Sequence, residues 1–169
     1  MKQKVWFFPF IFVVMIWGCG YRFTGGGDFP FQIKSIFVPV FENRSAETGI
    51  ETVITNDFIY ELTRSSNVSV VEKEIADAVL WGVLTSLSTQ TISRSGTQTP
   101  LERRVRLYLD LKLTDRQGKV LWATQGFSDD ESYDVSSDKF STEQRKRAAI
   151  KRLSRRMAEM IYYQLTDIE

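Results

Sequence analysis

A strict alternation of apolar and polar residues over 104–113 is the strongest constraint on how this chain folds. The aliphatic positions are Val105, Leu107, Leu109, Leu111 and Leu113. The positions between them are Arg104, Arg106, Tyr108, Asp110 and Lys112. Successive side chains of a strand point to opposite faces of the sheet. The pattern therefore predicts a long strand with one face on a core and the other facing water or a partner.

The segments on either side of this strand carry further strand and turn signals. Val79–Ile92 is a strand that loses hydrophobicity along its length, and Arg94-Ser95-Gly96 has the chemistry of a turn. Asp115-Arg116-Gln117-Gly118 is a hairpin turn, and Val120–Phe127 is its return strand. An acidic loop is expected over 129–138. These segments predict an antiparallel meander.

Two more strands and two helices complete the expected domain. Gln32–Phe41 alternates as a strand, in which Pro39 favours an edge position. Asn67–Val71 is a short strand. Capping-box spacing at Thr48–Glu51 and Ser141–Gln144 opens the two helices. We expect an α+β fold with an antiparallel or mixed sheet of four to five strands, packed on one face by two helices.

The amino terminus has the features of an export signal. Lys2 and Lys4 precede an apolar run from Val5 to Trp17, which is several residues short of the roughly 20 that cross a bilayer as a helix. The run ends at Ile16-Trp17-Gly18-Cys19, which resembles a lipobox, although Trp17 replaces the usual small residue. An ordinary signal peptide or an anchor helix is the alternative. The position of the only cysteine favours the lipobox.

These features divide the chain into three parts. We expect a lipoprotein signal peptide over 1–18, a lipidated Cys19 with a glycine-rich tether over 19–30, and a single α+β domain over 31–169. Cys19 would anchor the mature protein to a membrane through acyl chains. Gly20 is not the Asp that retains many lipoproteins at the inner membrane, so the expected location is the periplasmic face of the outer membrane.

Composition excludes several classes of function. The chain has no histidine and one cysteine, which excludes His-containing triads and metal sites, intramolecular disulfides and CxxC motifs. With 22 Lys and Arg against 21 Asp and Glu, the formal charge of +1 argues against a nucleic-acid partner. We expect no catalytic residues, no metal and no cofactor. A periplasmic hydrolase has little support, and binding or structural roles rank ahead of catalysis.

The order of motifs resembles the LPS-assembly lipoprotein family, LptE. The resemblance rests on Cys19-Gly20-Tyr21, on Val38-Pro39-Val40-Phe41-Glu42-Asn43, and on the helix, meander and final helix that follow. It implies a plug inside an outer-membrane β-barrel translocon that binds lipopolysaccharide (LPS) and helps deliver it to the outer leaflet. The segment starting at Val38 is also similar to lipoproteins that activate peptidoglycan synthases, which tend to have parallel α/β architecture.

The resemblance also implies which residues bind LPS. A basic residue in the turn of the middle hairpin corresponds to Arg94, and one just before the last helix corresponds to Lys139. Arg103, Arg104 and Arg106 flank the same hairpin. Arginine suits lipid A phosphates because its planar donors bind phosphate in a bidentate manner. The alternative is that these side chains only keep an exposed loop and sheet face soluble.

A basic cluster early in the last helix is the strongest local charge feature. Its members are Arg145, Lys146, Arg147, Lys151, Arg152, Arg155 and Arg156. We favour a solvated helix face paired with the acidic segment 129–138. Contact with anionic headgroups or with a barrel lumen is the other interpretation.

Overall fold

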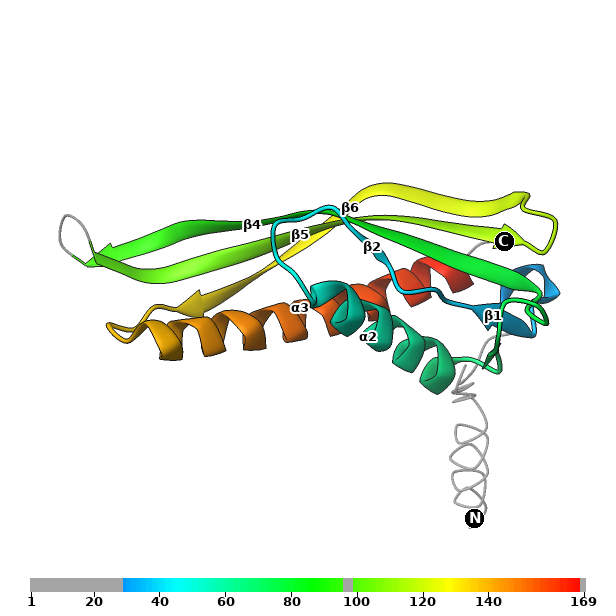
Figure 1. Ribbon diagram of the computed structural model, residues 1–169, viewed down its shortest axis with the longest axis horizontal. Coiled ribbons are helices and arrows are strands. Elements are labelled where there is room, and N and C mark those ends of the chain that lie inside the picture. Colours follow the sequence, from blue (N-terminus) through cyan, green and yellow to red (C-terminus); the bar gives the residue numbers. More distant parts are fainter. Residues whose placement is uncertain (1–28, 96–98, 168–169) are drawn as a thin grey trace, which may run out of the picture.

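A long twisted sheet and two helices form two layers in the computed structural model, which describes residues 29–95 and 99–167. Figure 1 shows helices α2 (Ile50–Ser65) and α3 (Lys139–Thr166) on the same face of the sheet. The strands are β1 (Ser35–Phe37), β2 (Glu42–Asn43), β3 (Ser69–Val70), β4 (Ala78–Ser95), β5 (Thr99–Asp115) and β6 (Val120–Asp134). A short 3-10 helix, η2 (Pro30–Gln32), precedes β1. This arrangement confirms the α+β fold with two helices on one face.

The sheet is mixed, in the order β3-β1-β4-β5-β6, with β2 also paired to β4. Strands β1 and β2 run parallel to β4, and β4, β5 and β6 form the expected antiparallel meander. The sheet has 6 strands because β2 directly follows the segment predicted as one strand over Gln32–Phe41, of which only β1 is paired in the sheet.

The edge position predicted from Pro39 is wrong. Strand β1 lies between β3 and β4, and Pro39 falls in the connection between β1 and β2. A proline lacks the N–H that a paired strand needs, so here it interrupts the strand instead of placing it at an edge.

The alternation in β5 builds the core as predicted. The inward side chains Val105, Leu107, Leu109, Leu111 and Leu113 are all buried. They face a layer of apolar helix residues that includes Ile54, Phe58, Leu153, Met157 and Ile161. Tertiary packing of these two faces, more than helix propensity, stabilises the helices.

A close approach at Gly82 fixes how the β2 segment joins the core. A Cβ at this position would lie 2.5 Å from atoms of the Phe41 ring. That ring also packs edge-to-face on Phe58 of α2, at a centroid distance of 5.1 Å. The glycine therefore leaves the space that lets Phe41 lie between the sheet and α2.

Both helix starts differ from the predicted capping boxes. Helix α2 is preceded by Gly49 at φ 84°, and no side chain caps it. Helix α3 starts at Lys139, because Asp138 accepts hydrogen bonds from the N–H groups of Phe140 (3.3 Å) and Ser141 (2.8 Å). An aspartate at this position accepts hydrogen bonds from N–H groups of the first turn, and its negative charge interacts favourably with the positive end of the helix dipole.

The acidic loop predicted over 129–138 is wrong for its first part, since β6 continues to Asp134. Asp129, Asp130 and Glu131 of this segment have basic partners, on both faces of the sheet, as described below. No helix in the described part of the chain has the length and apolar character needed to span a membrane.

Candidate functional site

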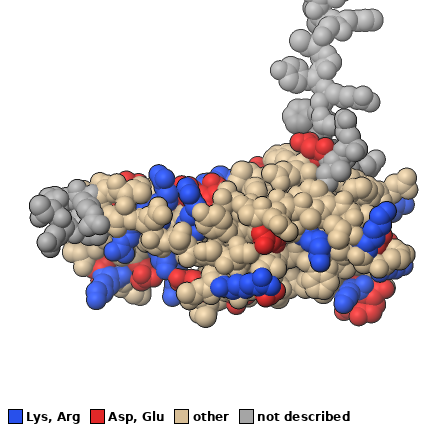
Figure 2. Space-filling model, turned by 90° about the horizontal axis from the view of Figure 1, so that it is seen from above, with Lys and Arg blue, Asp and Glu red and all other residues tan. Residues whose placement is uncertain are grey.

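The face of the sheet that the helices leave uncovered carries a pair of arginines on its central strand. Even-numbered residues of β5 point to this face, opposite to the buried leucines. Arg104 lies between Gln90 of β4 and Ser132 of β6. Arg106 lies between Ser88 of β4 and Asp130 of β6. Figure 2 looks onto the sheet layer and shows basic and acidic groups interspersed among uncharged ones.

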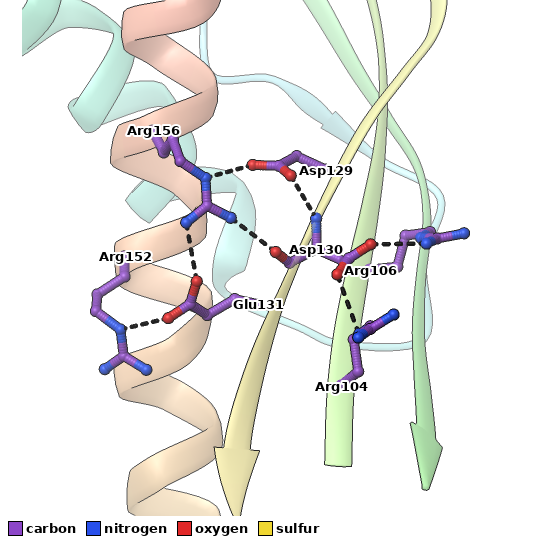
Figure 3. Close-up of polar contacts among 7 residues, drawn as sticks. All are labelled: Arg104, Arg106, Asp129, Asp130, Glu131, Arg152 and Arg156. Atoms are coloured by element: carbon purple, nitrogen blue, oxygen red, sulfur yellow. Dashed lines mark hydrogen bonds and ion pairs between the residues drawn. The ribbon is translucent and has the colours of Figure 1, made fainter. Parts of the chain in front are cut away.

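Asp130 is shared by both arginines (Figure 3). Its Oδ1 accepts a hydrogen bond from Arg106 Nη2 at 2.6 Å, and its Oδ2 lies 3.1 Å from Arg104 Nε. Arg104 Nε is buried, and this ion pair lacks the geometry of a hydrogen bond. The two arginine side chains are 41% and 43% exposed, and that of Asp130 is 28% exposed. Each guanidinium thus makes a single contact to Asp130 and remains partly exposed, with Tyr108 beside Arg106.

These contacts favour the charged forms of Asp130 and Arg106. The hydrogen bond from Arg106, followed by the charges of Arg104, Arg106 and Arg156, lowers the pKa of the Asp130 carboxyl below its usual value. The hydrogen bond to Asp130 raises the pKa of Arg106. Two cations and one anion give the cluster Arg104–Asp130–Arg106 a net positive charge at neutral pH. It is suited to an anion with several oxygen acceptors.

The neighbours of Asp130 in β6 point the other way, toward α3. Arg156 donates from Nε to Asp129 Oδ2 (2.6 Å) and from Nη1 to Glu131 Oε2 (2.8 Å). Arg152 donates to Glu131 Oε1 at 2.7 Å. Hydrogen bonds from Arg156 and then Arg152 lower the pKa of the Glu131 carboxyl. The predicted pairing of the basic helix with the acidic segment is confirmed for these two arginines.

Other members of the basic cluster have different surroundings. Lys146 pairs with Glu47 at 2.6 Å, which ties α3 to the loop before α2. Arg155 approaches Asp57 of α2 at 3.7 Å. Within the described residues, Arg145, Arg147 and Lys151 are exposed and form no ion pair.

The structure brings only some of the candidate residues together. Arg104 and Arg106 are neighbours on the open face, whereas Arg103 points to the helix side, opposite Tyr133. Lys139 is the exposed first residue of α3. The backbone of Arg94 pairs with Pro100, so Arg94 belongs to β4 and not to the turn. Cys19 lies outside the described residues.

Sequence reasoning missed Asp130, which was assigned to a solvated loop. The hairpin pairs Thr114 with Val120, and an unbroken register from there would place Ser128 opposite Arg106. Two register shifts, between Leu109 and Leu111 and between Leu113 and Thr114, bring Asp130 there instead. Extending the return strand past residue 127 would have placed the acidic segment beside β5, but not in the register that brings Asp130 opposite Arg106.

Solved structures with a similar fold include several bacterial lipoproteins. Lipoprotein B from Nitrosomonas europaea has a TM-score of 0.60 at 14% identity, over 87% of this chain and 90% of that one. A minor lipoprotein from Acinetobacter baumannii has a TM-score of 0.54 at 16% identity, over 79% and 90%. The rare lipoprotein B of Shewanella oneidensis has a TM-score of 0.50 at 13% identity, over 73% and 91%. No curated protein sequence matches.

Fold similarity at these low sequence identities does not assign the chain to a family, but a match to a family model does. The model described as lipopolysaccharide-assembly, LptE, matches residues 33–165, which include every described strand and nearly all of both helices. The chain therefore belongs to the LptE lipopolysaccharide-assembly family.

Proposed function

We propose that this protein is an outer-membrane lipoprotein that binds LPS through the open sheet face and assists a β-barrel LPS translocon. The observation that carries the proposal is the position of Arg104 and Arg106 side by side on the uncovered face, where both side chains are partly exposed. Family membership supports the role in LPS assembly. The role is that of a ligand carrier, with no catalytic step.

The end of the β4–β5 hairpin adds apolar surface beside basic residues. Ile92 and Leu101 near this end are exposed, and so is Phe140 in the first turn of α3. The hairpin end and the start of α3 lie at the same end of the molecule (Figure 1). Lys139 and Arg103 belong to this region, and Arg94 is the last but one residue of β4. Lipid A has both phosphates and acyl chains, so a mixed basic and apolar surface suits it.

A lipid anchor at Cys19 is part of the proposal. The described chain starts at η2, at the opposite end of the long axis from the β4–β5 hairpin (Figure 1). An anchor attached before η2 therefore joins the domain at the end opposite to the hairpin. This suits a protein that is held at a membrane while its far end enters a barrel or meets a ligand.

The second candidate, an activator of a peptidoglycan synthase, is less well supported. Its expected parallel α/β architecture differs from the antiparallel meander of β4, β5 and β6. Isolation of the full protein from native membranes separates the two. Co-purification of a large outer-membrane β-barrel supports the proposal, and recovery of a peptidoglycan synthase in its place contradicts it.

The LPS-binding part is tested with the double variant Arg104→Gln/Arg106→Gln. We expect its dissociation constant for LPS micelles to rise by about tenfold, measured by surface plasmon resonance on the full chain. Lys112→Gln/Lys119→Gln is the matched control, because it removes the same charge from exposed positions elsewhere in β5 and its turn. Equal losses in both variants would reduce the effect to general charge attraction.

A further inference from the structure

The cluster Arg104–Asp130–Arg106 holds a carboxylate where the proposed function requires a phosphate. We infer that Asp130 is a displaceable internal ligand, which occupies the arginine pair in the free protein and leaves it when the phosphate of LPS binds. Asp130 would then set how readily LPS is released. This inference rests on the proposed function and adds a residue that controls the same site.

The geometry of the cluster suits a phosphate better than a carboxylate. One carboxylate serves two guanidiniums with one oxygen each, and neither arginine makes a two-point contact. Arg104 Nε is buried with only the ion-pair approach to Asp130 Oδ2 and no hydrogen bond. A phosphate offers three acceptor oxygens to these two planar donor groups. The arginine pair is therefore better matched by a phosphate than by Asp130.

The carboxylate of Asp130 can leave the arginines without moving its strand. The Asp130 carbonyl accepts a hydrogen bond from Arg156 Nη2 at 2.7 Å, and its N–H donates to Asp129 Oδ1 at 2.8 Å. These contacts, drawn in Figure 3, hold the backbone from the helix side. Displacement then needs only a rotation of the Asp130 side chain on the open face.

Breaking the contacts of Asp130 to the arginines costs little free energy. Ion pairs between partly exposed side chains are weak, because water already solvates both charges. The Asp130 side chain and both arginines are in this class. An anion with more charge and more acceptors exchanges for such a partner easily. The retained carboxylate also returns to the arginines when the ligand leaves, which favours release.

The test is the variant Asp130→Asn in the full chain, with dissociation from LPS micelles followed by surface plasmon resonance. Removing the competing charge should slow dissociation and lower the dissociation constant by roughly fivefold. Asp134→Asn is the matched control, since it makes the same change on the same strand and face, opposite Glu102. We expect less than about a twofold effect there.

Two further arms identify the cause of any gain. In the Arg104→Gln/Arg106→Gln background, Asp130→Asn should give no gain in binding. LPS stripped of its phosphates should bind the wild type and Asp130→Asn equally. Binding to phosphatidylglycerol vesicles shows whether the site recognises LPS or any phosphate-bearing lipid. A gain in affinity is a result that damage to the fold does not produce.

Three outcomes overturn the inference, and they are distinguishable. If the arginine variants bind LPS less well but Asp130→Asn matches the wild type, Asp130 is a fixed structural partner and the proposed function stands. If Asp134→Asn gives the same gain, the effect is long-range charge. If neither wild type nor Asp130→Asn binds LPS, the proposed function fails and this inference fails with it.

Discussion

The two faces of β5 differ in function although their residues alternate along one strand: one packs in the core, and the other carries the candidate site. Toward the helices, Leu107 and Leu109 are fully buried in the core. Toward the open side, Arg104 and Arg106 are nearly half exposed and share Asp130. The buried face specifies the strand and its packing, whereas the open face is free to vary without disturbing the core. The candidate site is therefore separated from the determinants of the fold.

The face of the sheet that the helices cover contacts α3 in two ways, through apolar packing and through ion pairs. Leu153, Met157 and Ile161 bury one stripe of α3 in the apolar core. Beside that stripe, Arg152 and Arg156 of the same helix hold β6 through Asp129 and Glu131. Helix α3 is thus packed by two kinds of contact, which differ in strength and in their dependence on pH.

Truncating the buried face should have the largest effect on stability. Leu109 pairs with Leu84 and Phe127 on neighbouring strands and has no exposed surface. Leu109→Ala should lower the free energy of unfolding by about 2–5 kcal/mol, because it removes apolar contacts and leaves a cavity. Chemical denaturation of the domain measures this. Lys112→Ala on the open face should change the free energy of unfolding by less than about 0.5 kcal/mol. Equal effects of the two substitutions would contradict the difference between the two faces.

Loss of the ionic contact of α3 should lower the free energy of unfolding by less than loss of an apolar contact does. Arg156→Gln removes hydrogen bonds to Asp129, Glu131 and the Asp130 carbonyl. Because the arginine is partly exposed, we expect a loss of about 1–2 kcal/mol in the free energy of unfolding.

Arg155→Gln is the control for this prediction. Arg155 lies two-thirds exposed on the same helix, 3.7 Å from Asp57, and its loss should cost less than about 0.5 kcal/mol. A cost for Arg156→Gln that matches the one for Leu109→Ala would show that ion pairs, not leucines, hold α3 on the sheet.

The buried half of the fold was predictable because periodicity reports burial directly. The alternation of β5 and the helix layer agreed with the structure. Other contacts between distant segments were not predictable. No local pattern shows that Gly82 has to leave space for the Phe41 ring, or that Pro39 separates two strands paired to the same neighbour.

The candidate site was predictable only in part, for the same reason. Arg104 and Arg106 follow from the alternation, since both have to lie on the face opposite the leucines. Asp130 does not, because two register shifts in the β5–β6 pairing decide which residue lies opposite Arg106. Bulges of this kind depend on how the whole sheet twists, and they move a side chain along the neighbouring strand without any strong mark in the sequence.

Acid should weaken the ionic contact of α3 selectively, which is the smallest of the expected effects. Hydrogen bonds from Arg156 and Arg152 lower the pKa of Glu131 in the folded protein. The stabilisation is therefore fully present above the pKa of the unfolded carboxyl, about 4.3, and is lost as the pH falls through the lower folded value. The Tm of the wild type should fall over this interval.

The variant Glu131→Gln separates this contribution from general acid effects. It lacks the carboxylate at every pH, so its Tm deficit relative to the wild type should be largest near pH 6 and should shrink toward pH 3. Glu74→Gln, at an exposed position, should keep a nearly constant difference from the wild type over the same range. A Glu131→Gln deficit that stays constant down to pH 3 would mean that the side chain supports β6 by packing and not by charge. The face of the sheet under α3 would then differ from the open face in burial alone.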